Sequence, residues 1–235
     1  MSFKIDFHVH TYHSFDSINK PKTIIRKARA KGLDAVVVLD HDSIKGGAET
    51  ARMGANASAL PAEDVLIIPS VEINSDIGDL IGLFVREEIK VRAYRDVIKA
   101  VKDQGGLVIM PHPYYRHDFR DDLFGLIDLI EINNARLPRA MNQQAKELAE
   151  KYQIPEVSGS DAHFPWEIGN CVTEFENVPA STAELKEMLL KGKRVHHVRL
   201  SSINNTIASQ LIKYAKRPGS LWQRLRKLAG MPKHG

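Results

Sequence analysis

The feature that most constrains the fold is an alternation of short apolar runs with longer amphipathic stretches. Continuous Val/Ile/Leu runs, such as those at 34–40 and 106–112, are typical of strands buried on both faces. The stretches at 21–32 and 91–106 carry apolar residues at helical spacing and end at glycine. Repeated β–α alternation predicts a parallel α/β fold, either closed into a barrel or open and doubly wound.

The predicted elements cover most of the first 200 residues. We expect strands at 4–10, 34–40, 65–73, 80–85, 106–112, 129–134 and 155–163, with two more at 171–175 and 194–200. We expect helices at 21–32, at 91–106, from about residue 138 onward and at 182–193.

The composition is that of an ordinary globular protein, and it narrows the classes of protein to which the chain can belong. The 235 residues are enough for one large domain or a domain with an appendage, and the formal net charge is only +4. Cys171 is the only cysteine, which excludes an intramolecular disulfide and fits a reducing compartment. We find no signal peptide and no apolar run long enough to span a membrane, so we expect a cytoplasmic protein.

The last part of the chain differs from the rest, and we predict a main domain at 1–200 and a basic helical C-terminal extension at 201–235. From Arg217 onward the chain has basic residues and no acidic one. Its apolar residues Leu221, Trp222, Leu225 and Leu228 can share one helical face. We favour a terminal helix docked on the main domain over a nucleic-acid contact or a membrane-surface helix.

Residue types that bind metals follow nearly every predicted strand. His8 and His10 point to the same face at the end of the first strand, because side chains alternate along a strand. The ends of later strands carry Asp40-His41-Asp42, Glu72, His112, Asn133-Asn134, and Asp161 with His163. These strand ends meet on one side of an α/β fold, where a buried cluster without cations would carry large desolvation and repulsion costs. The sequence therefore predicts a metal site there.

Five motifs in order carry a family resemblance. "DFHVHTYHSFD", "LDHDS", "VEIN", "PHP" and "SGSDAH" resemble the successive motifs of the PHP family, named for polymerase and histidinol phosphatase. The match runs from Lys4 to about His163, with weaker similarity to about Lys193. The resemblance implies a distorted (β/α)7-type barrel with a metal centre, usually trinuclear, at the C-terminal ends of the strands.

The resemblance also implies which residues hold the metals. The first group is His8, His10, Glu72 and Asp161, the second is Glu72 and His112, and the third is Asp16, His41 and His163. Asp79 stands where many relatives have a histidine, so it either replaces that ligand or marks a weaker second site. His13 and His117 match no ligand position and are expected to lie in loops or to orient ligands. We expect two to three divalent ions, Zn, Mn or Fe, because the set lacks a thiolate.

The predicted chemistry is phosphate-ester hydrolysis by a metal-activated water, with Glu72, Asp161 and His112 as the predicted catalytic residues. No protein nucleophile is required, and the chain has neither a GxSxG elbow nor a Walker loop. Arginines near the predicted strand ends are candidates to hold the substrate phosphate, namely Arg116, Arg120 and Arg136.

Three hypotheses for function follow. The first is a hydrolase acting on a small phosphorylated metabolite or a nucleotide. The second is a nuclease acting on short DNA or RNA, and the third is a non-catalytic metal-binding PHP module. The full ligand set argues against the third, and the lack of a polymerase or ligase region predicts a free-standing enzyme. A deep closed pocket would favour small substrates and an open basic groove would favour nucleic acid. The substrate, the metal and the oligomeric state are left open.

Overall fold

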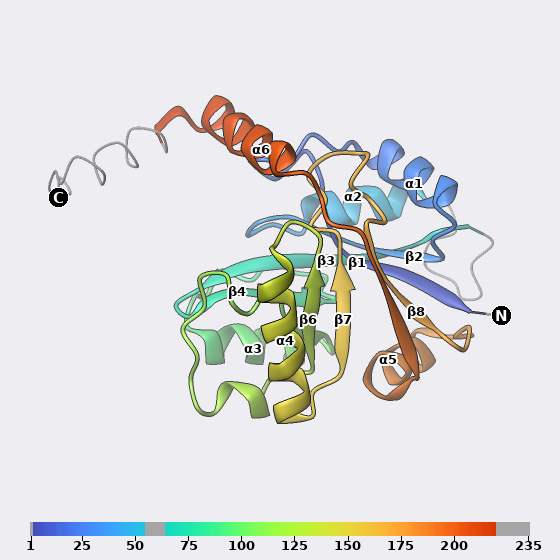
Figure 1. Ribbon diagram of the computed structural model, residues 1–235, viewed down its shortest axis with the longest axis vertical. Coiled ribbons are helices and arrows are strands. Elements are labelled where there is room, and N and C mark those ends of the chain that lie inside the picture. The colour runs from blue at the N-terminus through green and yellow to red at the C-terminus, as the bar shows by residue number, and fades with distance from the viewer. Residues whose placement is uncertain (1, 55–63, 220–235) are drawn as a thin grey trace, which may run out of the picture.

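The computed structural model describes residues 2–54 and 64–219, which form one nine-stranded sheet surrounded by helices (Figure 1). The strands are β1 (Phe3–His10), β2 (Ala35–Leu39), β3 (Leu66–Ser75), β4 (Gly78–Leu83), β5 (Leu107–Met110), β6 (Leu129–Asn134), β7 (Glu156–Gly159), β8 (Cys171–Phe175) and β9 (Arg194–Val198). The helices are α1 (Pro21–Ala30), α2 (Lys45–Met53), α3 (Tyr94–Asp103), α4 (Arg139–Tyr152), α5 (Thr182–Lys191) and α6 (Ile203–Lys216), with a 3₁₀ turn η1 (Leu123–Gly125).

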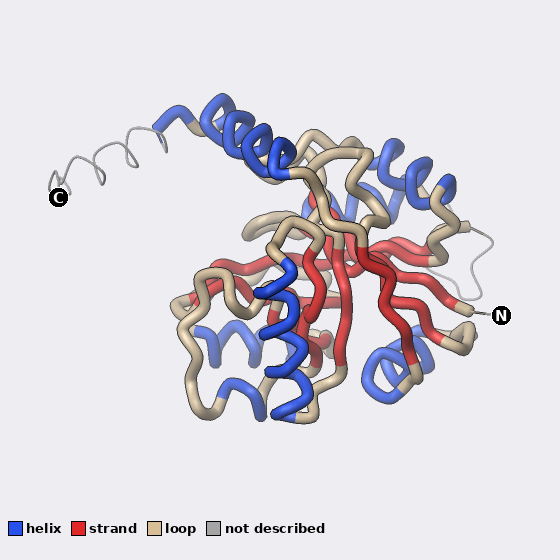
Figure 2. The backbone as a smooth tube through the Cα atoms, viewed as in Figure 1, coloured by secondary structure: helices blue, strands red, loops and turns tan. Residues whose placement is uncertain are grey.

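The sheet curls into a nearly closed barrel. Its strand order is β7-β6-β5-β4-β3-β2-β1-β8-β9. The segment after β7 returns to β1, where the His10 N–H donates to the Ala162 carbonyl at 3.0 Å and the Ala162 N–H donates to the His8 carbonyl at 3.1 Å. Figure 2 shows the strands curving around a common interior with helices outside them. The predicted distorted α/β barrel is confirmed.

The expectation of an all-parallel sheet is wrong at two strands, β4 and β8, which run against the other seven. β4 runs antiparallel to both β3 and β5, β8 runs antiparallel to β1, and β9 runs antiparallel to β8. β3 and β4 are joined by only Asp76 and Ile77, which is too short for a crossover between parallel strands. The nine strand positions were predicted correctly within a few residues.

The barrel interior is filled by one apolar cluster to which β1–β8 all contribute, with Phe7, Phe175 and Leu189 of α5 among its members. A second cluster packs α3 and α4 against the outside of the sheet, and a third packs α1. Helix α2 was not predicted, because its segment contains two glycines and few large apolar residues. The helices therefore leave the C-terminal ends of the strands to loops and to α6 (Figure 1).

Part of the predicted C-terminal extension is described. Helix α6 falls within 201–235, whereas the predicted face of Leu221, Trp222, Leu225 and Leu228 lies outside the described residues. The division at residue 200 stays a prediction. Across 2–54 and 64–219, every helix is too short or too polar to cross a bilayer.

Candidate metal centre

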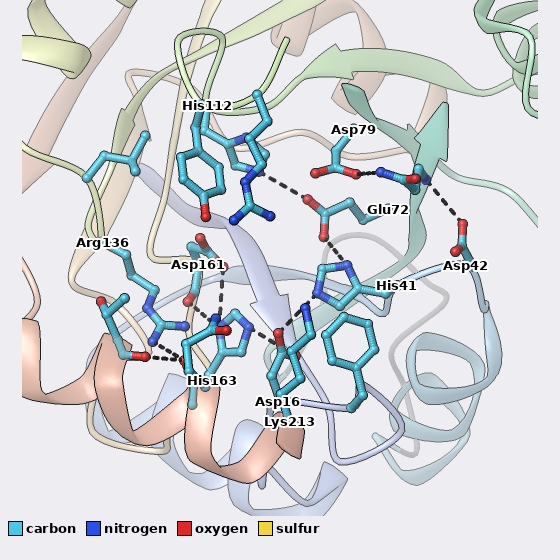
Figure 3. A pocket seen from close by; sticks show the side chains of 18 of the residues that line it. Asp16, His41, Asp42, Glu72, Asp79, His112, Arg136, Asp161, His163 and Lys213 are labelled. Atoms are coloured by element: carbon cyan, nitrogen blue, oxygen red, sulfur yellow. Dashed lines mark hydrogen bonds and ion pairs between the residues drawn. The ribbon is translucent and has the colours of Figure 1, made fainter. Parts of the chain in front are cut away.

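All nine predicted ligands converge at one end of the barrel. Figure 3 shows seven of them, namely Asp16, His41, Glu72, Asp79, His112, Asp161 and His163. They come from β1 and its loop, the segments after β2, β5 and β7, and strands β3 and β4. Asp79 reaches this end only because β4 is antiparallel, so that its first residues lie beside the last residues of β3. The site is thus built where parallel strands end and an antiparallel strand begins.

His8 and His10 are placed by an irregularity in β1. The pairing of β1 with β2 shifts register between Asp6 and Val9. Phe7 therefore packs in the barrel interior while the next residue, His8, faces the site, and Val9 packs on the outside. A bulge of this kind re-aims side chains beyond it. The Nε2 atoms of His8 and His10 lie 3.1 Å apart, and both side chains are buried.

Partners on the far side of each ring leave these Nε2 atoms available. Nδ1 of His8 lies 3.1 Å from Glu131 Oε1, a carboxylate that only accepts, so Nδ1 carries the proton. Nδ1 of His10 lies 3.1 Å from Ser14 Oγ, and the Ser14 hydroxyl donates to Asp40 at 2.6 Å. Ser14 therefore accepts from His10. Nε2 of both rings therefore faces the same point, as in metal-binding histidines.

Glu72 lies at the centre of the cluster. Its Oε1 is 3.1 Å from His112 Nε2, and its Oε2 is 2.9 Å from His41 Nδ1. His8 and His10 approach the same carboxylate at 3.8 and 3.5 Å. Burial alone would raise the pKa of Glu72, but the surrounding histidines lower it well below its usual range. Glu72 is thus an ionised carboxylate with a histidine next to each of its two oxygens.

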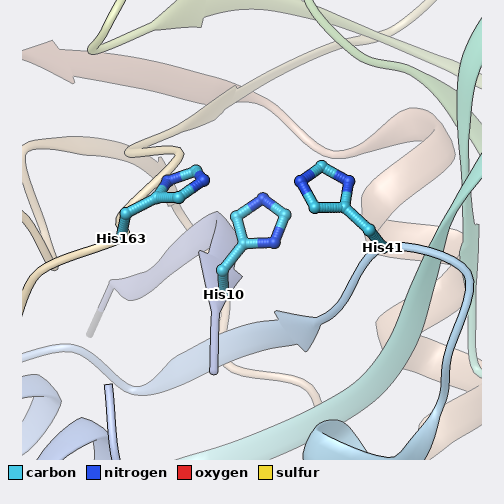
Figure 4. Close-up of side chains that lie close together, drawn as sticks. All are labelled: His10, His41 and His163. Carbon is cyan, nitrogen blue, oxygen red and sulfur yellow. The ribbon is translucent and has the colours of Figure 1, made fainter. Parts of the chain in front are cut away.

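Asp16 joins the third predicted group. Its Oδ1 is 3.2 Å from His163 Nε2, and its Oδ2 is 3.5 Å from His41 Nε2. Nδ1 of His163 donates to the Asp161 carbonyl at 2.8 Å, which frees Nε2. Figure 4 shows that His10 projects between His41 and His163, with ring centroids 4.6 and 4.4 Å away. His10 therefore belongs by position to the third group as well as to the first.

Asp161 completes the first group. Its Oδ1 lies 3.7 Å from His8 Nε2 and 3.4 Å from His10 Nε2, and its Oδ2 accepts from Asn134 at 3.2 Å. The backbone at Asp161 has φ 49°, and that at His112 has φ 32°. Positive φ is uncommon for residues with side chains and is often found at functional sites.

Asp79 lies in the second group with Glu72 and His112, where one ligand atom from each comes within 4.8 Å of the others. Burial and the Glu72 charge raise the pKa of Asp79, and Asn74 donates to it at 2.8 Å. His117 is not in this group, but its Nε2 donates to the Asp79 carbonyl at 2.7 Å. His13 pairs with Glu49 at 2.8 Å, outside the cluster.

The two histidines of β1 have opposite electrostatic surroundings. Burial lowers the pKa of His8, but Asp161, Glu131 and Glu72 overcome this and raise it to about 10. Burial and the neighbouring His163 lower the pKa of His10 to about 3. In the protein without metal, the carboxylates thus retain a proton on His8 while His10 is neutral. A bound cation would take the place of that proton.

The donor set fits divalent metal ions. Glu72 Oε2 and Asp16 Oδ1 are buried and form ion-pair contacts, but neither has a hydrogen-bond partner among the described residues. In each of three groups, one ligand atom per residue lies within 4.8 Å of the others, namely His8, His10 and Glu72; Glu72, Asp79 and His112; and His10, His41 and His163. Imidazole and carboxylate ligands without thiolate suit Zn, Mn and Fe.

Several residues that organise the site were missed from the sequence. Glu131 holds His8 with one oxygen and accepts from the His112 backbone N–H at 2.9 Å with the other. Asp40 accepts from Thr11 and Ser14 and so fixes the β1 loop. A Cβ at Gly159 would collide with Glu131 and His8, so this position requires glycine. The sequence feature that could have identified Glu131 is the presence of a carboxylate within the apolar run of β6.

The metal groups line a pocket of about 480 Å³ that is also bordered by α6 (Figure 3). Arg116 and Arg136 line it, as predicted for phosphate-binding residues, whereas Arg120 is exposed and is not one of its lining residues. Lys213 and Arg217 line the pocket as well and were not predicted. Cys171 is buried away from the pocket, and burial raises the pKa of its thiol, which makes it a poor nucleophile.

A nearly closed α/β barrel with overlapping His/carboxylate groups at the strand ends defines a metal-binding barrel. The PHP domain model matches residues 6–155, and the PHP-associated model matches residues 139–193. An uncharacterized protein of Methanocaldococcus jannaschii is 33% identical over 168 residues, which cover 63% of this chain and 95% of that protein. The chain belongs to the PHP family.

Solved structures share the fold at low sequence identity. A proposed metal-dependent phosphoesterase from Bifidobacterium adolescentis is 16% identical, with a TM-score of 0.57 over 79% of this chain and 95% of that chain. A lesion-specific endonuclease from Pyrococcus furiosus is 17% identical, with a TM-score of 0.61 over 83% of this chain and 57% of that chain.

Proposed function

We propose that the protein is a metal-dependent phosphoesterase that hydrolyses small phosphorylated molecules at a site of two to three divalent ions, Zn, Mn or Fe. The observation that carries this proposal is the central position of Glu72, whose buried carboxylate lies 3.5 Å from His10 of the first group and 3.1 Å from His112 of the second. A carboxylate in this position suits a bridging ligand of adjacent ions. Such ions, when bound, activate a water and neutralise the oxygens of a phosphate ester.

The chain's own residues would hold and orient the centre. His8, His10, Glu72 and Asp161 are proposed for the first ion; Glu72, His112 and Asp79 for the second; and Asp16, His41 and His163 for the third, with His10 also in reach. Glu131 and Ser14 keep the protons on Nδ1 of His8 and His10, so that Nε2 stays a donor to metal. The carbonyl of Asp161 does the same for His163.

A nuclease is the second candidate. The endonuclease with the same fold and the cations Lys213 and Arg217 at the pocket favour it. Against it, α6 is fixed beside the pocket at both of its ends, by Arg136 and by Lys216. This arrangement supports a confined site more than an open groove. We therefore place the small phosphate ester first and retain the cytoplasmic location as a prediction.

The test is a substrate panel. Metal-stripped protein would be reloaded with Mn, Zn or Fe and assayed on phosphorylated metabolites, nucleotides and short oligonucleotides. We expect phosphate release from a small ester that requires added metal and is abolished by a chelator. Faster cleavage of oligonucleotides than of every small ester would establish the nuclease instead. Metal binding without hydrolysis of any substrate would support the non-catalytic module.

A further inference from the structure

Helix α6 is attached to the barrel at both ends. Near its start, the Arg136 guanidinium donates from Nη2 to the Asn205 carbonyl at 2.9 Å and to Ser209 Oγ at 2.8 Å. At its end, the Lys216 ammonium donates to three carbonyls of the loop after β1, those of Tyr12, Ser14 and Ser17, at 2.9, 2.9 and 2.7 Å. The helix is thereby held against both the β6 side and the β1 side of the pocket.

Between these attachments, α6 presents a polar face to the metal groups. Thr206, Ser209, Gln210 and Lys213 line the pocket, and Arg217 continues this face just after the helix. Lys213 Nζ lies 4.7 Å from the centre of the Phe15 ring, and the Arg217 guanidinium carbon lies 4.4 Å from it. Phe15 also stacks on His41 with a centroid distance of 4.6 Å. The two cations are therefore held next to the third metal group.

The Lys213 ammonium has three N–H donors, and its contact with the Phe15 ring still allows it to donate to an anion. The side chain of Lys213 reaches the space enclosed by Asp16, His41 and His163 (Figure 3). Arg136, in contrast, already donates to α6, so its main role in this structure is to hold the helix. The pocket wall formed by α6 thus adds positive charge to that of Arg116 and Arg136 on the barrel side.

We propose that α6 is the substrate wall of the site, and that Lys213 binds the phosphate of a small phosphate monoester. This rests on the proposed phosphoesterase function and specifies its substrate class. A terminal phosphate carries two negative charges and is attached to the rest of the molecule on one side, so the pocket needs only one opening. An internal phosphodiester of a nucleic-acid strand continues on both sides of the phosphate, so the pocket would have to be open on both sides. A helix attached at both ends beside a pocket of about 480 Å³ favours the terminal group.

The first experiment measures the binding of inorganic phosphate to the metal-loaded protein by calorimetry. Lys213→Gln is expected to weaken phosphate binding about tenfold, because a charge-assisted hydrogen bond is lost. Lys213→Arg is expected to stay within a few-fold of the parent. The matched control is Lys191→Gln on α5, far from the pocket, which should bind phosphate like the parent. Metal content is measured for each variant.

Unchanged phosphate affinity in Lys213→Gln would overturn the proposal. Loss of metal from this variant would also overturn it, because Lys213 would then support the metal site. If Lys213→Gln does not fold, Lys213→Met carries the same test with the same expected result.

The second experiment compares p-nitrophenyl phosphate with bis-(p-nitrophenyl) phosphate. We expect the parent to prefer the monoester, and Lys213→Gln to lose part of that preference through a higher KM. A parent that prefers the diester would refute the assignment of α6. If the parent hydrolyses neither ester but binds phosphate through Lys213, the anion site stands and the proposed phosphoesterase function fails.

Discussion

Replacement of Lys216 by methionine tests how far α6 stabilises the loop that carries Asp16. The ammonium of Lys216 donates three hydrogen bonds of 2.7–2.9 Å to carbonyls on either side of Asp16. Methionine keeps most of the length and apolar contact of the side chain but removes the charge and all three donors. The change therefore isolates the contribution of the hydrogen bonds.

The expected loss of stability is smaller than three separate hydrogen bonds would give. A hydrogen bond from a charged donor contributes about 1.5–3 kcal/mol. The three bonds share one ammonium group, and burial lowers the pKa of Lys216, so desolvation offsets part of the gain. We expect a loss of about 2 kcal/mol in the free energy of unfolding. For a chain of this size, that corresponds to a Tm lower by about 4–8 °C.

The assay is thermal denaturation of metal-free and metal-loaded protein, with Lys191→Met as the control. Lys191 is exposed, and among the described residues its ion pair is with Glu187 at 3.2 Å, so its replacement should change stability by less than about 0.5 kcal/mol. Lys216→Met should also lower the occupancy of the third metal group, because Asp16 lies on the released loop. Melting within about 1 °C of the parent, with full metal content, would refute this reasoning.

Three further predictions concern the metal centre itself. Glu72→Gln should reduce activity by orders of magnitude and lower the metal content, while the circular dichroism spectrum shows that the fold is kept. Near-normal turnover with all ions bound would disprove the bridging role. By elemental analysis, Asp79→Ala should lower the metal occupancy of the second group, and Asp79→His should keep or raise it. The same metal content as the parent in both variants would show that Asp79 is not a ligand. The raised pKa of His8, about 10, means that metal must displace a proton at neutral pH, so affinity should increase with pH below that value. Calorimetry in two buffers of different ionisation enthalpy would detect the released proton, and equal affinities at about pH 6 and about pH 8 would contradict the prediction.

The sequence determined the element pattern and, to a large extent, which candidate ligands the fold brings together. Buried strands have continuous apolar runs because both of their faces are covered, so strands such as β2, β3 and β5 could be located from the residues. The predicted ligands could be collected because the C-terminal ends of parallel strands meet at one end of a barrel. His8, Glu72 and Asp161 follow this rule and lie together in the structure.

Only the tertiary structure decided features that depend on contacts between distant segments. The antiparallel direction of β4 brings Asp79 to the metal groups, and the bulge in β1 turns His8 away from Phe7. Neither follows from apolar periodicity, which is the same for parallel and antiparallel strands and does not show a change of register. Glu131 reads as an isolated charge in β6 until the fold places it beside His8, 123 residues away. Likewise, Lys213 became part of the pocket only because Arg136 and Lys216 attach α6 to the barrel, and no local pattern specifies where a terminal helix will pack.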